Sequence, residues 1–296
     1  MNVNTKRTIG KFFTHLVILF FAVLMLYPIV WLFMKSFTPN DEIFSNITAL
    51  VPQHFTLDNY TAGFMPQGTL SKSFLYYMGN SMYLSLVVVI FNGVSCSMAA
   101  YAFARIKFAL RGFWFAVVLI TLMLPYHVIV IPRYILFNNM GLINMRNVGG
   151  MNLNFLYLPL TLPRLFATDA FFIFLLVQFM RGIPKDLDES ATLDGCGKVG
   201  IYFRIIIPLS TAALVTTGLF SFLWTWDDYF SQLLYILDSA RNTVPIALRS
   251  FIASDSVSNW GASLAMSVLS IIPCFILFFS MQKYFVQGIT TTGLKG

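Results

Sequence analysis

The sequence predicts an all-α protein that crosses a membrane about six times as a bundle of helices. Of its 296 residues, 57% are hydrophobic and only 10% are charged, whereas soluble domains average roughly 25% charged residues. Several apolar stretches reach the length of about 20 residues that a membrane-crossing helix needs. Basic residues gather between these stretches. We therefore expect lipid, and not water, to cover most of the protein's surface.

Six stretches are long and apolar enough to cross a bilayer, and because lipid offers the backbone no hydrogen-bond partner, each is expected to be helical. They are Phe12–Met34, Gly79–Phe103, Gly112–Ile131, Leu153–Met180, Ile205–Trp226 and a stretch within Ser256–Gln282. The first follows basic residues, as a signal peptide would. However, it is longer than an apolar signal core of roughly 7–15 residues, and no small-residue cleavage site follows it. We interpret it as a retained span.

The basic residues predict the orientation of the chain. Twelve of the 19 Lys and Arg residues fall on the side shared by both termini and the second and fourth loops, and six fall on the opposite side. Because cytoplasmic loops carry an excess of Lys and Arg, both termini are predicted to be cytoplasmic. The net charge of +7 is thus explained by orientation, and we expect no nucleic-acid partner.

The cysteines indicate neither a disulfide framework nor a metal site. Cys96, Cys196 and Cys274 are far apart and odd in number. By span and loop, the chain divides into residues 1–73 (first helix and external loop), residues 74–282 (a core of five helices) and residues 283–296 (a cytoplasmic tail).

The loop at residues 181–208, RGIPKDLDESATLDGCGKVGIYFRIIIP, has clear helix punctuation. Pro184 can begin a helix, because its missing N–H would be unpaired there anyway. Three carboxylates then fall in the first turns, where they favour the positive end of the helix dipole. Gly195 and Gly197 interrupt this helix, and a second short helix leads to Pro208.

This loop resembles the EAA loop of bacterial ABC importer permeases, whose pattern is Glu-Ala-Ala, three residues, Gly, nine residues, Ile-x-Leu-Pro. Here it reads Glu189-Ser190-Ala191, then Gly195, then Ile205-Ile206-Ile207-Pro208, with both spacings kept. The departures are Ser190 for Ala and Ile207 for Leu. In that family the loop forms coupling helices that dock into a cleft of a cytoplasmic ATPase. The resemblance implies a type I importer permease fold and the following ATPase-coupling residues: Glu189, Ser190, Ala191, Asp194, Gly195 and Pro208.

The resemblance extends along nearly the whole chain. Further stretches look like those of carbohydrate-uptake permeases: KSFTPNDEIF, AAYAFARIKF, WTWDDYF and QKYFVQGITTTGLKG. They most resemble the second permease of the maltose system and its lactose, arabinose and oligogalacturonide relatives. In maltose-type relatives the C-terminal tail reaches into the ATPase dimer interface. The resemblance therefore makes Lys295 a further coupling candidate, with a frayed chain end as the alternative.

The function that the resemblance implies is a permease subunit of an ATP-driven importer in the cytoplasmic (inner) membrane. An external solute-binding protein would deliver a sugar or oligosaccharide, and a second permease would complete a heterodimer, with a homodimer left open. The sequence has no GxxxxGK[ST] phosphate loop. We expect the chain itself to be non-catalytic and without a cofactor, and a cytoplasmic ATPase dimer to bind ATP and Mg.

Three other classes of membrane protein are alternatives. A transporter driven by an ion gradient needs an ion site near the midplane, to which only Arg164 and Asp169 could contribute. An intramembrane enzyme needs a nucleophile–base pair or metal ligands within the spans, and the sequence suggests neither. An importer of peptides, phosphate or amino acids could share the EAA loop, but the end-to-end similarity favours sugar.

Arg164 and Asp169 are candidates for the substrate path, because an ionisable residue inside a membrane is costly and usually faces a functional cavity. Alternatively, Pro159 and Pro163 mark the outer end of this helix, and Arg164 extends to the interface. A guanidinium would suit a uronate carboxylate, so an acidic oligosaccharide is a possible substrate.

A second candidate cluster lies at the outer end of the fifth span. Sugars are bound by aromatic stacking and carboxylate hydrogen bonds, whereas an interfacial aromatic belt would explain the same residues without a substrate. The cluster consists of Trp224, Trp226, Asp227, Asp228 and Tyr229. His127 is expected to be a packed or interfacial histidine.

Overall fold

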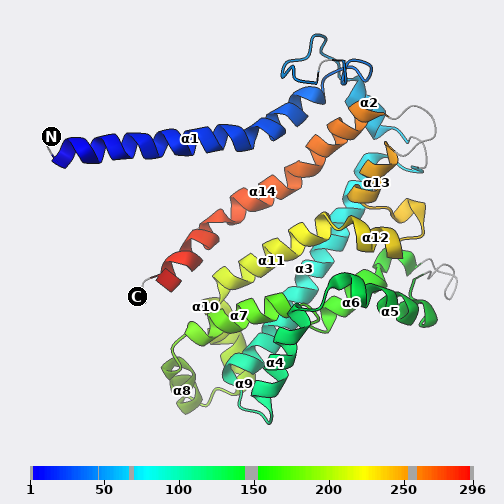
Figure 1. Cartoon of the computed structure of the whole chain (residues 1–296). Helices are drawn as coiled ribbons and strands as arrows, with labels where there is room; N and C mark the ends of the chain where they lie inside the picture. Colours follow the sequence, from blue (N-terminus) through cyan, green and yellow to red (C-terminus); the bar gives the residue numbers. More distant parts are fainter. Residues whose placement is uncertain (1–2, 46, 67–69, 144–152, 253–258, 294–296) are drawn as a thin grey trace. The chain divides into compact units, whose positions relative to one another are not determined.

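The computed structural model describes residues 3–45, 47–66, 70–143, 153–252 and 259–293 (Figure 1). Within these residues the secondary structure is helical and no strand is present, so the all-α prediction is confirmed. The α-helices are α1 (Val3–Lys35), α2 (Asp58–Phe64), α3 (Phe74–Arg105), α4 (Arg111–Leu122), α5 (Tyr126–Asn139), α6 (Leu158–Leu165), α7 (Ala170–Gly182), α8 (Asp186–Leu193), α9 (Lys198–Ile201), α10 (Ile207–Leu209), α11 (Thr211–Trp226), α12 (Tyr229–Tyr235), α13 (Val244–Ser250) and α14 (Trp260–Gly293). Short 3-10 turns occur at Leu153–Leu156 and Ser239–Arg241, and a π-helical turn at Tyr202–Ile206.

Four of the described helical segments are long and apolar enough to cross a membrane: Gly10–Lys35, Phe74–Arg105, Leu158–Gly182 and Trp260–Tyr284. Two further segments pass the same test only as bent pairs, α4 with α5 and α9–α10 with α11. If each bent pair is one span, the number is six, as the sequence predicts.

The bends are the main difference from the straight spans expected at Gly112–Ile131 and Ile205–Trp226. The first pair bends by 101° at Pro125, whose backbone is extended with ψ 131° and which disfavours a helical conformation in the residue before it. The second pair bends by 77° at Ser210, whose N–H is shared between the carbonyls of Ile206 and Ile207. A hydropathy pattern records the length of an apolar run and not its direction, so neither bend was predicted.

The chain forms two compact units. One comprises residues 1–74 and 248–272, and the other comprises residues 75–247 and 273–296. In the first unit Asn59 is buried, and its amide donates to the carbonyls of Ser36 (2.9 Å) and Thr38 (2.7 Å). Gly261 lies directly against this amide, where a Cβ on residue 261 would come 2.1 Å from Asn59 Oδ1.

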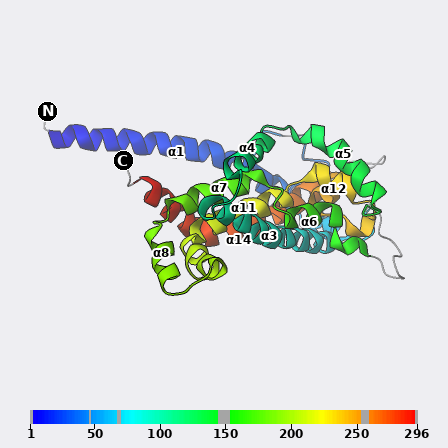
Figure 2. The same ribbon diagram turned by 90° about the horizontal axis from the view of Figure 1, so that it is seen from below.

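The second unit has its core where α3, α7 and the segment before α11 meet. Helix α3 has a small buried side chain at every fourth position: Cys96, Ala100 and Ala104. They belong to one cluster with Leu176 and Met180 of α7. Small residues let helix backbones approach closely, which is how membrane helices gain packing energy. In both views α8 lies at one end of this unit, and α5 and α12 lie at the other (Figures 1 and 2).

The end of this unit near α12 is fixed by hydrogen bonds from side chains to a loop backbone. Asn80 at the start of α3 donates to the carbonyl of Asn242 (2.9 Å), and Tyr157 donates to the carbonyl of Arg241 (2.9 Å).

Gly261→Ala should destabilise the first unit by about 1–3 kcal/mol, because the added methyl displaces an amide that two hydrogen bonds hold in place. The change should be measured as a lower midpoint of thermal unfolding of the purified protein in detergent. Gly79→Ala is the matched control, since a Cβ at this helical glycine meets nothing within 4 Å. Equal midpoints for the two variants would contradict the packing of Gly261 against Asn59.

Candidate functional site

The loop at residues 181–208, called the EAA-like loop here, folds as the sequence predicts into two short helices, α8 and α9, interrupted by glycines. Gly195 has a left-handed φ of 81°. Its N–H donates to the carbonyl of Thr192 (3.0 Å), and the N–H of Cys196 donates to the carbonyl of Ala191 (2.8 Å). These two bonds form a Schellman motif, which ends a helix with a residue that is usually glycine.

Most of the predicted coupling residues lie on the surface of this loop. Glu189, Ser190, Asp194, Gly195 and Pro208 are exposed. Ala191 is half-buried and packs against the core between α3 and α7. Lys295 lies outside the described residues.

Apolar side chains are also exposed on the EAA-like loop. Leu193 is 89% exposed, Val199 71% and Phe203 63%. Leu187 is also largely exposed. An exposed apolar surface beside charged side chains is typical of a protein-docking site, but the coupling role of this loop stays a prediction.

A cavity of about 290 Å³ lies at the other end of the same unit and gathers part of the predicted substrate path. Arg164, Trp224 and Asp228 line it, whereas Asp169, Asp227 and Tyr229 are not among its lining residues. The remaining lining residues are Leu84, Val88, Tyr126, His127, Leu160, Thr225, Phe230, Ser231 and Gln232.

Trp226 differs from its expected surroundings, whereas His127 packs against other rings and also lines the cavity. Trp226 is buried and its ring stacks on Phe222, with ring centroids 5.4 Å apart, so it belongs to the core. His127, expected to be packed or interfacial, lines the cavity, and its ring lies 5.5 Å from that of Phe230.

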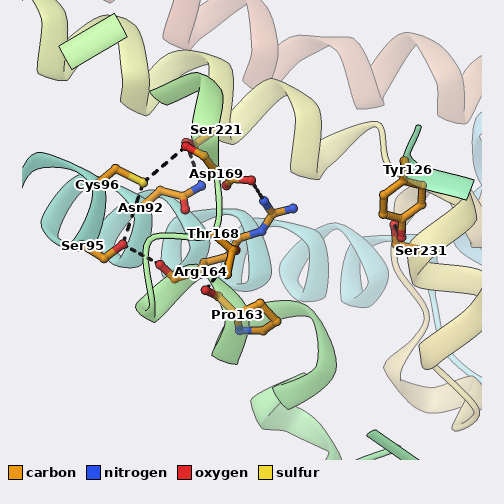
Figure 3. A network of polar contacts seen from close by, with 10 residues as sticks. All are labelled: Asn92, Ser95, Cys96, Tyr126, Pro163, Arg164, Thr168, Asp169, Ser221 and Ser231. Carbon is orange, nitrogen blue, oxygen red and sulfur yellow. Dashed lines mark hydrogen bonds and ion pairs between the residues drawn. The ribbon is translucent and has the colours of Figure 1, made fainter. Parts of the chain in front are cut away.

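Arg164 and Asp169 form an ion pair across the break between α6 and α7 (Figure 3). The guanidinium Nη1 of Arg164 donates to Asp169 Oδ1, and the side chains are 32% and 20% exposed. Ala167, within this break, has a left-handed φ of 52°, although α6 and α7 together still form one candidate span, Leu158–Gly182. Because Arg164 lines the cavity and is paired with a carboxylate, its charge is offset within the protein and does not need to reach the membrane interface.

Side chains of α3 hydrogen-bond with backbone carbonyls around this break. The Ser95 hydroxyl donates to the carbonyl of Arg164 (2.6 Å), and the Cys96 thiol lies 3.9 Å from the carbonyl of Asp169 (Figure 3). Irregular backbone at membrane depth is tolerated only where protein groups satisfy it.

Other polar groups of the cavity come from α5 and α12: Asp228, which the sequence analysis named, and Tyr126, Ser231 and Gln232, which it did not. The hydroxyls of Tyr126 and Ser231 are 2.8 Å apart (Figure 3). Asp228 Oδ1 accepts from the N–H of Ser231 (2.9 Å) and so caps α12. Gln232 is buried, and its Nε2 donates to the carbonyl of Thr225 (2.6 Å). The one sequence signal for these residues is Asp228 itself, because an aspartate just before a helix is a typical N-cap.

The arrangement suits a polar ligand without strong net charge. Aromatic rings offer apolar faces, and the hydroxyls and the amide offer directional hydrogen bonds. Of the charged lining residues, Arg164 is paired with Asp169, and the carboxylate of Asp228 accepts from the N–H of Ser231 in the first turn of α12. In the part of the chain that the structure describes, no group of three or more His, Cys, Asp or Glu side chains could hold a metal ion.

Comparison with known proteins decides the family. Residues 92–291 match the family model described as binding-protein-dependent transport system inner membrane component. The chain belongs to this family. The matched range contains the EAA-like loop and most of the residues that line the cavity.

Curated relatives match over nearly their full length. The chain is 32% identical to the arabinooligosaccharides transport system permease protein AraQ of Halalkalibacterium halodurans, covering 94% of each chain. It is 28% identical to the diacetylchitobiose uptake system permease protein DasC of Streptomyces coelicolor, covering 98% of this chain and all of the relative. It is 27% identical to the sn-glycerol-3-phosphate transport system permease protein UgpE of Brucella abortus, covering 97% and 98%.

A solved structure supports the fold. A chain of a bacterial ABC transporter involved in the import of the acidic polysaccharide alginate superimposes with a TM-score of 0.78, over 96% of this chain and 99% of that one, at 20% identity. As a member of the family, this chain is thus an inner-membrane subunit of a transport system that works with a binding protein.

Gly195→Asp should leave the protein in the membrane and abolish transport, because it adds both a side chain at a left-handed φ and a negative charge at the predicted docking surface between α8 and α9. Gly195→Asn should lose less, since asparagine tolerates this φ as aspartate does but adds no charge. Transport should be measured as uptake in cells that contain the whole system. Gly112→Ala, at an exposed helical glycine with nothing within 4 Å, is the control. Normal uptake by the Gly195→Asp variant would contradict the predicted role of this turn.

Proposed function

We propose that this chain is a permease subunit of an ATP-driven importer that carries a sugar or oligosaccharide across the cytoplasmic membrane. The observation that carries the proposal is a cavity of aromatic, hydroxyl and amide side chains in a member of the binding-protein-dependent transport family. Relatives named for arabinooligosaccharides, galactooligosaccharides and diacetylchitobiose support a saccharide substrate.

The proposed complex contains three kinds of partner. A second, different permease completes the membrane channel, an extracytoplasmic solute-binding protein delivers the substrate, and a cytoplasmic ATPase dimer binds ATP and Mg and hydrolyses the nucleotide. This chain is non-catalytic. Both of its termini and the EAA-like loop lie in the cytoplasm, which the excess of Lys and Arg on that side supports.

Transport then follows from the geometry of the EAA-like loop. The exposed apolar residues Leu193, Val199 and Phe203 dock on the ATPase beside the carboxylate of Glu189. When ATP binding closes the ATPase dimer, the docked loop moves with it. Because Ala191 packs against the core, this movement reaches the helices as a rigid-body shift between two packings.

The substrate is proposed to be hydroxyl-rich and either neutral or acidic. A neutral saccharide would find the Arg164–Asp169 pair already balanced in charge. An acidic sugar is the second candidate, because a guanidinium has five N–H donors and the pair with Asp169 leaves some of them for a substrate carboxylate.

The experiment is reconstitution of both permeases, the ATPase dimer and the binding protein in proteoliposomes. Saccharide-loaded binding protein should stimulate ATP hydrolysis and ATP-dependent uptake. Uptake that needs neither ATPase nor binding protein would overturn the proposal.

Trp224→Ala should lower uptake about tenfold, because the aromatic face at the cavity is lost. Trp114→Ala, which removes a half-exposed tryptophan on α4 away from the cavity, is the matched control. Arg164→Gln separates the two substrate classes, since it should lower uptake of an acidic saccharide far more than that of a neutral one. If Trp224→Ala and Trp114→Ala transport equally well, the cavity is not on the substrate path.

A further inference from the structure

Three side chains on one face of α3 hydrogen-bond with the EAA-like loop or with the end of α7. Ser97, Tyr101 and Arg105 are four residues apart, which places them one above another on a helix. The hydroxyls of Ser97 and Tyr202 are 2.7 Å apart, and Tyr101 donates to the carbonyl of Lys198 (2.8 Å). The hydrogen bonds of these three side chains link α3 to segments that lie about 75 to 105 residues further along the chain.

Arg105, the last residue of α3, makes the strongest of these connections. Its side chain is only 3% exposed. Nη2 donates to the carbonyls of Met180 and Ile183 (2.7 Å each), and Nη1 lies 3.2 Å from Asp188 Oδ2 in α8. One guanidinium thus joins three helices.

The chemistry of this contact requires arginine. The carbonyls of Met180 and Ile183 lie at the C-terminal end of α7, where the last four carbonyls lack the usual i+4 partner, although that of Met180 also accepts from the N–H of Ile183 (3.3 Å). A planar fork of donors can satisfy two carbonyls and a carboxylate at once, whereas a lysine ammonium is a single point charge. A charge buried to this degree is costly unless it is paired and hydrogen-bonded.

Few other contacts hold α8. No residue of this helix is buried, and only Ala191 is half-buried against the core. The Arg105–Asp188 pair is therefore a main attachment of α8 to the membrane-embedded helices.

The same helix α3 also reaches the cavity, which Leu84 and Val88 line. Arg105 and Leu84 are 21 positions apart on one continuous helix, which corresponds to about 30 Å at a rise of 1.5 Å per residue. Figure 1 shows α8 and α9 beside one end of α3.

We propose that Arg105 is a positioning residue for transport: with Asp188, and supported by Tyr101 and Ser97, it fixes α8 and α9 to α3. A movement of the docked ATPase then displaces α3, and α3 carries the displacement to the cavity wall. This inference rests on the proposed function, because it assumes that the EAA-like loop receives the movement of an ATPase.

The test uses the complete complex, assembled with Arg105→Lys, Asp188→Asn or the Ser97→Ala, Tyr101→Phe double variant. The quantity measured is saccharide taken up per ATP hydrolysed by assembled complex. A positioning role predicts that this ratio falls by about threefold to thirtyfold. A purely structural role would lower the amount of assembled complex and leave the ratio unchanged.

Lys107→Ala is the matched control, since Lys107 is an exposed basic residue only two positions after Arg105. It should keep the wild-type ratio. Amide hydrogen exchange over residues 186–202 should rise in the three test variants, which shows that the loop has been released. The Ser97→Ala, Tyr101→Phe variant removes only hydroxyls, so it keeps the test informative if changes at Arg105 prevent assembly.

The outcomes distinguish failure of the proposed function from failure of the positioning role of Arg105. If the wild-type complex shows no ATP-dependent uptake, the proposed function fails. If the wild-type complex transports and the assembled variants keep its ratio of uptake to hydrolysis, the function stands and the positioning role of Arg105 is overturned.

Discussion

Lipid cannot satisfy a backbone N–H or carbonyl group, so each break in a membrane helix must find its hydrogen-bond partners within the protein. Helix α3 supplies those partners at two places. Near the break between α6 and α7, Ser95 donates to the carbonyl of Arg164. At the end of α7, Arg105 donates to the carbonyls of Met180 and Ile183. The long unbroken helix thus stabilises the irregular segments packed beside it.

This constraint also connects the two candidate sites. Along α3, Leu84 and Val88 line the cavity, Ser95 and Cys96 lie at the α6–α7 break, and the last turns hold the EAA-like loop. Small side chains at Cys96, Ala100 and Ala104 hold the same helix tightly against α7. A helix that is continuous and closely packed can transmit a displacement along its length, whereas a flexible connection would absorb it.

Much of the fold could be predicted from the sequence, because apolar length and glycine punctuation are local signals. Four of the six apolar stretches form single helices long enough to cross a membrane, the other two are bent pairs, and the two helices of the EAA-like loop are present as predicted. The bends at Pro125 and Ser210 were missed, since hydropathy carries no information on direction. Arg105 was counted only as a basic residue of a loop, because a sequence does not show that a charge at the end of a helix is buried against carbonyls 75 residues away.

The candidate site was predicted less completely, because its members come from helices that are distant in sequence. Of the aromatic residues noted on α11, Trp224 lines the cavity, whereas Trp226 belongs to the core. Tyr126 and Ser231 meet only after α5 and α12 come together. The pairing of Arg164 with Asp169 depends on the break between them and could not be read from their spacing.

The proposed function requires the EAA-like loop to face the cytoplasm and to bind an ATPase. A single cysteine at Leu193, in a chain whose three native cysteines are replaced by serine, tests it directly, because this side chain is 89% exposed. A membrane-impermeant maleimide should label Leu193→Cys in inside-out vesicles and not in intact cells, and labelling should slow when the ATPase dimer is bound. Labelling from the external side, or an unchanged rate with the ATPase bound, would contradict the account.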